Sequence, residues 1–110
     1  MKTPCVYIVA SKRDGILYIG VTSDLHGRMA EHDQGLIPGF TKRYGAKLLV
    51  YYELHDDMAT AIRREKQLKE WRRAWKVRLI ESMNPEWVNL FDAKSGEIAA
   101  GPADTSRQTS

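Results

Sequence analysis

The feature that most constrains the fold is a pair of apolar runs near the N-terminus, separated by a turn signal. Residues 5–10 are Cys-Val-Tyr-Ile-Val-Ala, and residues 16–21 are Ile-Leu-Tyr-Ile-Gly-Val. Between them lies Asp14-Gly15, a dipeptide that favours tight hairpin turns. Runs rich in β-branched and aromatic residues on both sides of such a turn predict two paired antiparallel strands.

Cap residues, periodicity and chain breakers predict four further elements: a helix over residues 25–34, a strand over 47–54, and helices over 57–71 and 73–83. Gly35 should end the first helix, and residues 35–45 should form a flexible, basic loop. Asn84-Pro85 should end the last helix. The order β-β-α-β-α-α predicts a small α/β (α+β) domain, with a three-stranded, mostly antiparallel sheet flanked by helices.

We expect the domain to span residues 1–91, because 110 residues are the size of one domain and residues 86–91 are an apolar closing segment. Residues 92–110 lack aromatic residues and are rich in Ala, Gly, Ser and Thr, which predicts a disordered tail. The single cysteine, Cys5, favours a reducing, cytoplasmic setting. The first ten residues lack a signal-peptide pattern, and no apolar run suggests a membrane span.

Glu65 falls on the apolar side of the long predicted helix. Helical spacing places Met58, Ala61, Ile62 and Leu68 on one stripe, with Glu65 projecting among them. Burying an unpaired carboxylate is costly, so Glu65 needs a cation, a metal ion or a raised pKa. Two interpretations stay open at this point: a functional site, or an ion pair with a neighbouring arginine at the rim of the core.

Basic residues concentrate in the last two helices, although the net charge of the chain is only +3. Such a run offers phosphate-binding charge, and a solvated helix face is its usual structural explanation. Trp71 and Trp75 interleave with it, and we expect them to pack in the core or between helices. The candidate nucleic-acid contacts are Arg63, Lys66, Lys69, Arg72 and Arg73.

Tyr7 and Tyr18 lie on the two paired strands. A two-residue turn would point both side chains to the same sheet face, whereas a turn of the other parity would separate them. Arg28 and His32 fall together on an otherwise apolar helix face. Each residue alone has a structural explanation, but an arginine, a histidine and a glutamate on inward faces together favour a functional site.

At these positions the sequence resembles the GIY-YIG nuclease superfamily. Cys5-Val6-Tyr7 stands in place of Gly-Ile-Tyr, and Tyr18-Ile19-Gly20 matches the second half of the paired motif. The later blocks that resemble the family are Leu25-x-x-Arg28-x-x-x-His32, Arg64–Lys69 and Asn84–Leu90. The last block is similar to the ending of the family's small, single-domain (URI-type) bacterial members. The resemblance covers residues 4–91.

The resemblance implies phosphodiester hydrolysis assisted by one divalent cation, Mg²⁺ or Mn²⁺. Glu65 would be its only protein ligand, which suits an ion that keeps most of its waters. Tyr18 would help to deprotonate the attacking water, with Tyr7 orienting the water or sharing the role. Arg28 would clamp the scissile phosphate, and His32 would contact the phosphate or relay a proton.

Two supporting residues and one departure complete the comparison. Gly20 belongs to the motif, and Asn89 would tie the closing segment to the site, in a structural or a catalytic role. Val21 occupies a position where some relatives carry a lysine that could lower the pKa of the tyrosine, which leaves the level of activity open.

The leading hypothesis is a metal-dependent endonuclease that acts on DNA, related to repair or recombination, with specificity that comes from DNA structure or from a partner protein. The alternative is a nucleic-acid-binding module of the same fold with weak or no cleavage. A nuclease acting on RNA is a third, weaker hypothesis.

Overall fold

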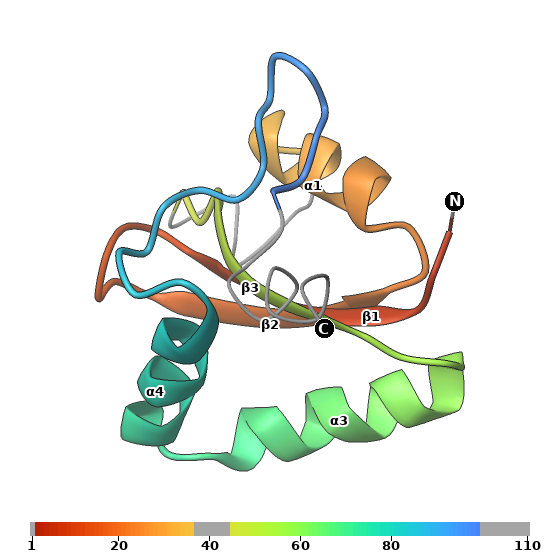
Figure 1. The fold of residues 1–110 in the computed structure, drawn as a ribbon, viewed down its shortest axis with the longest axis vertical. Coiled ribbons are helices and arrows are strands. Elements are labelled where there is room, and N and C mark those ends of the chain that lie inside the picture. The colour runs from red at the N-terminus through yellow and green to blue at the C-terminus, as the bar shows by residue number, and fades with distance from the viewer. Residues whose placement is uncertain (1, 37–44, 100–110) are drawn as a thin grey trace, which may run out of the picture.

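The structure, a computed structural model, describes residues 2–36 and 45–99. The elements are β1 (Cys5–Ala10), β2 (Leu17–Thr22), α1 (Leu25–Asp33), β3 (Leu48–Leu54), α3 (Met58–Glu70) and α4 (Arg73–Met83). The strands form one antiparallel sheet in the order β2-β1-β3. In Figure 1, α1 lies on one side of this sheet, and α3 and α4 lie on the other. The expected fold class and element order are confirmed.

The loop of the β1–β2 hairpin is longer than the expected two-residue turn. The Ser11 N–H donates to the Ile16 carbonyl (3.0 Å), and the Gly15 N–H donates to the Lys12 carbonyl (2.9 Å), so residues 12–15 form the loop. Asp14 adopts a left-handed conformation with φ of 58°. Asparagine and aspartate tolerate this region better than most residues because their short side chains can bond locally.

The longer loop nevertheless keeps both tyrosines on one face. Tyr7 pairs with Gly20, and Val9 pairs with Tyr18. This register is offset by two residues from the one that a two-residue turn would give. Side chains alternate with a period of two, so an even offset leaves the faces unchanged. Tyr7 and Tyr18 therefore point to the same side, as expected.

Helix α1 is capped at both ends by the residues that predicted its limits. The Asp24 carboxylate accepts a hydrogen bond from the Gly27 N–H (3.2 Å). At the other end Gly35 has φ of 71°, and the Leu36 N–H donates to the carbonyl of Glu31 (2.9 Å). A left-handed glycine of this kind is a common helix terminator. The expected flexible loop falls mainly on residues 37–44, which lie outside the described residues.

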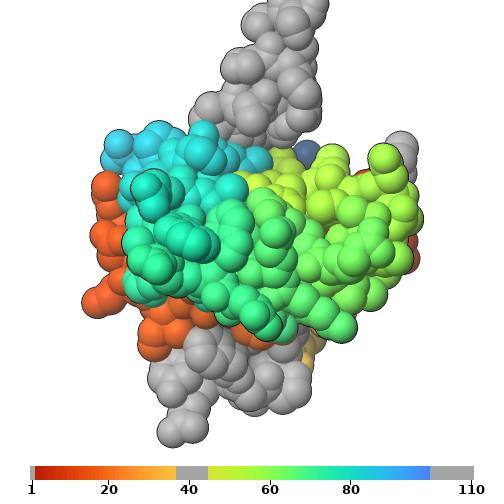
Figure 2. Space-filling view, turned by 90° about the horizontal axis from the view of Figure 1, so that it is seen from below, coloured from red at the N-terminus to blue at the C-terminus, as the bar shows by residue number. Residues whose placement is uncertain are grey.

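Helix α3 packs under β1 and β2 through a narrow stripe, and α3 and α4 together form the face shown in Figure 2. Ala61 and Leu68 are fully buried, and Met58 packs against the core. Ile62 is 36% exposed, so its expected place on the buried stripe was wrong. The stripe instead follows positions 58, 61, 65 and 68, which places Glu65 at its centre.

The segment after α4 covers the outer edge of β3. The buried Asn84 side chain donates to the carbonyls of Val50 (3.2 Å) and Val88 (2.8 Å). The Asn89 Oδ1 accepts the Leu49 N–H (3.0 Å), and the Leu90 N–H donates to the Leu49 carbonyl (2.8 Å). These bonds hold the closing segment on the sheet, as expected from its apolar composition.

The ordered chain continues past Phe91, where we expected the domain to end. Phe91 bridges to Ile98, and Ile98 packs against the core. The Tyr52 hydroxyl donates to the Ala99 carbonyl (3.1 Å). Residues 92–99 therefore form a hydrogen-bonded turn on the domain. Residues 100–110 of the expected tail lie outside the described residues.

Strand β1 is buried along its whole length, because it is the central strand and helices lie on both faces. Its first residue, Cys5, is a buried free thiol. Burial raises the pKa of this thiol to about 11, so it stays protonated. Within the described residues, no helix combines the length and apolar character needed to cross a membrane.

Candidate active site

Tyr7 and His32 meet between β1 and α1. The Tyr7 hydroxyl lies 3.0 Å from His32 Nε2, and the rings are edge-on with centroids 5.6 Å apart. Both residues are almost fully buried. Burial raises the pKa of the Tyr7 phenol, which therefore stays protonated at neutral pH. Burial, helped by the positive charge of Arg28, lowers the pKa of His32 to about 4, so its imidazole is neutral.

His32 also carries a buried polar atom whose hydrogen-bonding capacity is not satisfied within the described residues. Its Nδ1 has no hydrogen-bond partner among the described residues. A neutral imidazole has one donor and one acceptor nitrogen. If Nε2 carries the proton and donates it to Tyr7, the Tyr7 hydroxyl hydrogen remains available for another acceptor. Buried polar groups are rarely left unsatisfied without a functional reason.

Gly20 makes room for this pair. A Cβ atom at Gly20 would lie 2.5 Å from both the Cζ and the hydroxyl oxygen of Tyr7. That separation is far below van der Waals contact, so any side chain at position 20 would displace the tyrosine ring. The supporting role expected for Gly20 thus has a steric basis.

Tyr18 completes a cluster of three rings. Its centroid lies 6.3 Å from that of Tyr7 and 5.7 Å from that of His32. These separations fall within the range of favourable tilted and edge-to-face aromatic contacts. Tyr18 is half-buried on β2, an edge strand of the sheet, so this ring connects the buried pair to the surface.

Arg28 supplies positive charge at the border of the cluster. It lies on α1 one turn before His32, where its charge adds to the effect of burial in lowering the pKa of His32 and partly opposes the burial that raises the pKa of Tyr7. Its ion pair with Glu31 is 3.5 Å long, and its side chain is 40% exposed. An exposed pair of this kind is worth little, so the guanidinium can turn toward a bound phosphate at small cost.

Glu65 lies on α3, on the opposite side of the sheet from α1. Its carboxylate is 3.0 Å from Lys69 Nζ, and its side chain is only 14% exposed. The partner cation is thus a lysine, not the arginine of the structural interpretation. Lys69 and Tyr18 both line a surface hollow along β2, together with Leu17, Ile19 and Lys76. The edge of β2 therefore connects Glu65 with the three-ring cluster.

The residues around Glu65 fit a cation held by one protein carboxylate. Within residues 2–36 and 45–99, no three His, Cys, Asp or Glu side chains converge to form a larger ligand set. Mg²⁺ commonly binds through one or two carboxylates and keeps several waters. Lys69 already places positive charge at Glu65, and its side chain is 52% exposed. It can therefore leave when another cation takes its place.

Arg73 is engaged in the fold, although the sequence suggested a nucleic-acid contact. Its guanidinium donates to the carbonyls of Asp14 and Gly15, both at 2.8 Å. These bonds attach the start of α4 to the tip of the β1–β2 hairpin. The left-handed backbone at Asp14 helps to present these carbonyls to the arginine.

The other basic candidates remain on the surface. Arg63, Lys66, Lys69 and Arg72 are all exposed. Arg72 lies over the ring of Trp75, with Cζ 5.0 Å from the centroid. Trp75 is 42% exposed and so does not lie in the core, although its ring contacts that of Trp71, which packs against the core at the end of α3.

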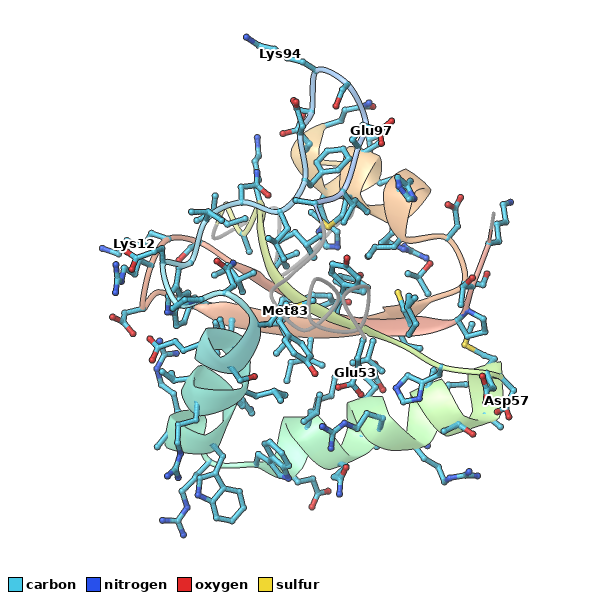
Figure 3. All side chains as sticks on the ribbon, viewed as in Figure 1. Lys12, Glu53, Asp57, Met83, Lys94 and Glu97 are labelled. Carbon is cyan, nitrogen blue, oxygen red and sulfur yellow. The ribbon has the colours of Figure 1, made fainter. Side chains whose placement is uncertain are left out.

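A polar network around Glu53 was missed by sequence reasoning. The Glu53 carboxylate accepts hydrogen bonds from Arg64 Nε (2.8 Å) and from the Tyr51 hydroxyl, and it lies 2.9 Å from His55 Nε2. Figure 3 shows Glu53 between the sheet and α3. Burial alone would raise the pKa of Glu53, but the bonds from Arg64, Tyr51 and His55 together lower it. The only sequence signal is that Tyr51 and Glu53 share one strand face, which cannot identify Arg64 as their partner.

Asn89 and Val21 stand apart from the ring cluster. The Asn89 Oδ1 is occupied by the backbone N–H groups of Leu49 and Phe91, both at 3.0 Å. These bonds give Asn89 a structural role, one of the two roles, structural or catalytic, that the sequence left open. Val21 is half-buried on β2 and pairs with Val6, so it brings no charge to Tyr18.

The fold and the cluster define a class of protein: a small mixed α/β domain with two tyrosines, a histidine and an arginine on one sheet face, and a mostly buried glutamate on the helix across the sheet. The GIY-YIG catalytic domain matches residues 3–78. The chain therefore belongs to the GIY-YIG family, a family of nucleases.

Curated relatives are found in staphylococci. A UPF0213 protein of Staphylococcus haemolyticus (strain JCSC1435) is 38% identical over 76 residues, which are 69% of this chain and 92% of the relative. A UPF0213 protein of Staphylococcus aureus (strain Mu3 / ATCC 700698) is 36% identical over 81 residues, which are 74% of this chain and 98% of the relative. No solved structure matches the chain.

Proposed function

We propose that this protein is a divalent-metal-dependent endonuclease that hydrolyses phosphodiester bonds in DNA. The observation that carries the proposal is the buried Tyr7–His32 pair beside Tyr18 and Arg28. A packing cluster gains nothing from an imidazole nitrogen that has no partner in the described part of the chain, or from an adjacent arginine. Hydrolysis of a phosphate ester, by contrast, needs hydrogen-bonding and cationic groups in one place. Membership of a nuclease family supports the same conclusion.

The two tyrosines take different roles in this proposal. Tyr7 is buried with a raised pKa, so it acts as a protonated phenol that orients the attacking water. Tyr18 lies nearer the surface on the edge strand and, in its phenolate form, would accept the water's proton as the nucleophile forms and so end as a phenol. The neutral His32 holds Tyr7 in place and contacts the phosphate or relays the proton through its Nδ1.

Arg28 and Glu65 act on the phosphate from the two sides of the sheet. Arg28 clamps the non-bridging oxygens and offsets charge that develops in the transition state. Glu65 would hold Mg²⁺ or Mn²⁺ in place of Lys69, and such a cation would supply stabilisation of the charge on the leaving oxygen. We infer that the DNA backbone lies along β2, because the hollow there is lined by both Tyr18 and Lys69.

The exposed basic residues of the C-terminal helices extend this path, and their attraction for DNA should weaken as salt rises. The proposed substrates are branched, nicked or otherwise irregular DNA of repair or recombination. A partner protein would supply any sequence specificity. We place the activity in the cytoplasm, where a protein whose one cysteine is a buried thiol needs no oxidising environment.

The test compares wild type with Glu65→Gln on branched, nicked, single-stranded and double-stranded DNA, with Mg²⁺ or Mn²⁺. Glu97→Gln is the matched control, because Glu97 is an exposed carboxylate far from α3 in Figure 3. We expect metal-dependent products from wild type and the control, and a loss of about 100-fold or more for Glu65→Gln. Identical product patterns from wild type and Glu65→Gln would refute the assignment.

The same experiment separates the alternatives. Salt-dependent DNA binding without metal-dependent cleavage by wild type would favour a binding module, a reading supported by Val21 and by the Lys69 pair at Glu65. Faster cleavage of RNA than of DNA in a parallel panel would identify RNA as the substrate.

A further inference from the structure

We propose that the hollow at the α3–α4 corner, lined by the exposed Trp75 and the half-buried Trp71, binds an unpaired base of a nucleic-acid strand. Trp71, Trp75, Arg78, Leu79 and Ser82 line this hollow. The proposal rests on the function proposed above and names the kind of substrate. It requires DNA with at least one unstacked nucleotide beside the bond to be cleaved.

The ring geometry is the first argument. The Trp71 and Trp75 rings are nearly perpendicular, with an interplanar angle of 85° and centroids 5.8 Å apart. Two perpendicular indoles form the walls of a corner, in which a planar base can stack on one ring and meet the edge of the other. Stacking of bases on aromatic side chains is the usual means by which proteins hold single strands.

Exposure is the second argument. Trp75 is 42% exposed although its residue type is usually well buried. Figure 2 shows α3 and α4 on the face that carries this corner. The third tryptophan, Trp87, is 3% exposed and donates its indole N–H to Glu81 (2.8 Å). The fold therefore buries a tryptophan where it needs one for packing, and it leaves Trp75 at the surface.

Charge identifies the occupant. Residues 69–78 carry a single acidic side chain, Glu70, among the basic side chains Lys69, Arg72, Arg73, Lys76 and Arg78. A second copy of the chain would bring the same positive charge to the same patch, which opposes self-association. A strand with phosphates on both sides of an apolar base matches a hollow with apolar rings and a basic rim.

The hollow also lies next to the proposed site of hydrolysis. Lys76 lines the β2 hollow with Tyr18 and follows Trp75 in α4. Its Nζ donates to the Lys69 carbonyl (3.5 Å), which joins α4 to the end of α3. The α3–α4 corner thus presents lysines on the side of Tyr18 and tryptophans on the side of Arg78.

The experiment measures binding of labelled oligothymidylate and of a duplex of equal length by fluorescence anisotropy, in EDTA and over a range of salt. We expect Trp75→Ala to weaken single-strand binding about tenfold, with little change for the duplex. Trp75→Phe should restore most of the affinity, because phenylalanine still stacks. Val88→Ala is the matched control, because Val88 is 55% exposed and lies outside the hollow. Trp75→Leu takes the place of the alanine variant if that variant does not fold.

Equal affinities of wild type and Trp75→Ala for the single strand, or equal losses for strand and duplex, would overturn the proposal. A dimer in light scattering that Trp75→Ala dissociates would assign the hollow to a second copy instead. Vesicle binding that depends on Trp75, without an effect on the oligonucleotide, would assign it to an anionic membrane. Because EDTA prevents metal-dependent cleavage, failure of this test leaves the Glu65 result intact, and failure of the Glu65 test leaves this one intact.

Discussion

At the scale of the residue, Gly20 and Tyr7 show how one missing side chain shapes the site. The Tyr7 ring occupies the space that a Cβ atom at Gly20 would fill. In this position of the ring, the Tyr7 hydroxyl lies within hydrogen-bonding distance of His32. The sequence places both residues in the family's paired motif, but it does not show that they touch. The contact depends on strand register, because Gly20 lies directly opposite Tyr7 on the neighbouring strand.

We predict that Gly20→Ala reduces cleavage about 100-fold, since a ring displaced by about 1 Å no longer holds its catalytic geometry. Ile8→Val is the control, because Ile8 is buried on the sheet face opposite Tyr7 and its substitution should cost only about 1 kcal/mol of stability. Cleavage rates and thermal melting of both variants check this prediction. Equal activity of Gly20→Ala and wild type would show that the Tyr7 position is not critical.

The titration of His32 gives a second prediction at this scale. Its pKa is about 4 in the folded protein and near its ordinary value of 6.5 when unfolded. Between these two pH values the unfolded chain binds a proton at His32 that the folded protein does not. The contribution of the neutral His32 to the free energy of unfolding is therefore complete above pH 6.5 and is lost as the pH falls toward 4. The size of the effect is up to about 3 kcal/mol. Denaturant melts of wild type and His32→Gln across this range should converge toward pH 4, and a constant difference would contradict the shift.

At the scale of the element, α3 is fixed by its neighbours on both sides. Glu53 on β3 holds Arg64, the residue before Glu65, and the Arg64 guanidinium lies over Trp71 with Cζ 5.2 Å from the ring centroid. These contacts fix the rotation of the helix. They explain why Glu65 rather than Ile62 lies on the buried stripe, a distinction that helical periodicity alone did not make.

We predict that Glu53→Gln lowers the free energy of unfolding at neutral pH by about 1–3 kcal/mol, because Arg64 and His55 lose a mostly buried carboxylate. The pKa of Glu53 is lowered in the folded state, so its contribution is present above the ordinary value of 4.5 and is lost as pH falls below it. The gap between wild type and variant should therefore shrink in acid. Glu97→Gln, an exposed substitution, should change stability little at any pH.

At the scale of the whole molecule, the domain closes through segments far apart in the chain. Arg73 binds the hairpin tip 59 residues before it, Asn89 binds β3 40 residues before it, and Tyr52 binds Ala99 47 residues after it. Composition predicted a tail from residue 92, yet residues 92–99 return to the sheet. Ile98 is the apolar residue in that stretch that gains enough contact to hold it there.

We predict that the free energy of unfolding of a chain ending at Phe91 is about 1–2 kcal/mol lower than that of the full chain, because the shortened chain loses the burial of Ile98 and the hydrogen bonds to Ala99. Ile98→Ala in the full chain should reproduce part of this loss. Chemical denaturation of the three proteins provides the measurement. Unchanged stability of the shortened chain would show that the turn contributes nothing to the domain.

The sequence by itself determined the elements and their order, and it predicted the common face of Tyr7 and Tyr18 only on the condition of the loop's parity. These depend on local caps, on side-chain periodicity and on loop parity, which neighbouring residues encode. Only the tertiary structure decided which distant groups meet: His32 with Tyr7, and Arg64 with Glu53. It also decided that Trp75 is exposed. These outcomes depend on how each helix is rotated and placed on the sheet, and that is fixed by packing of the whole core rather than by any single stretch of sequence.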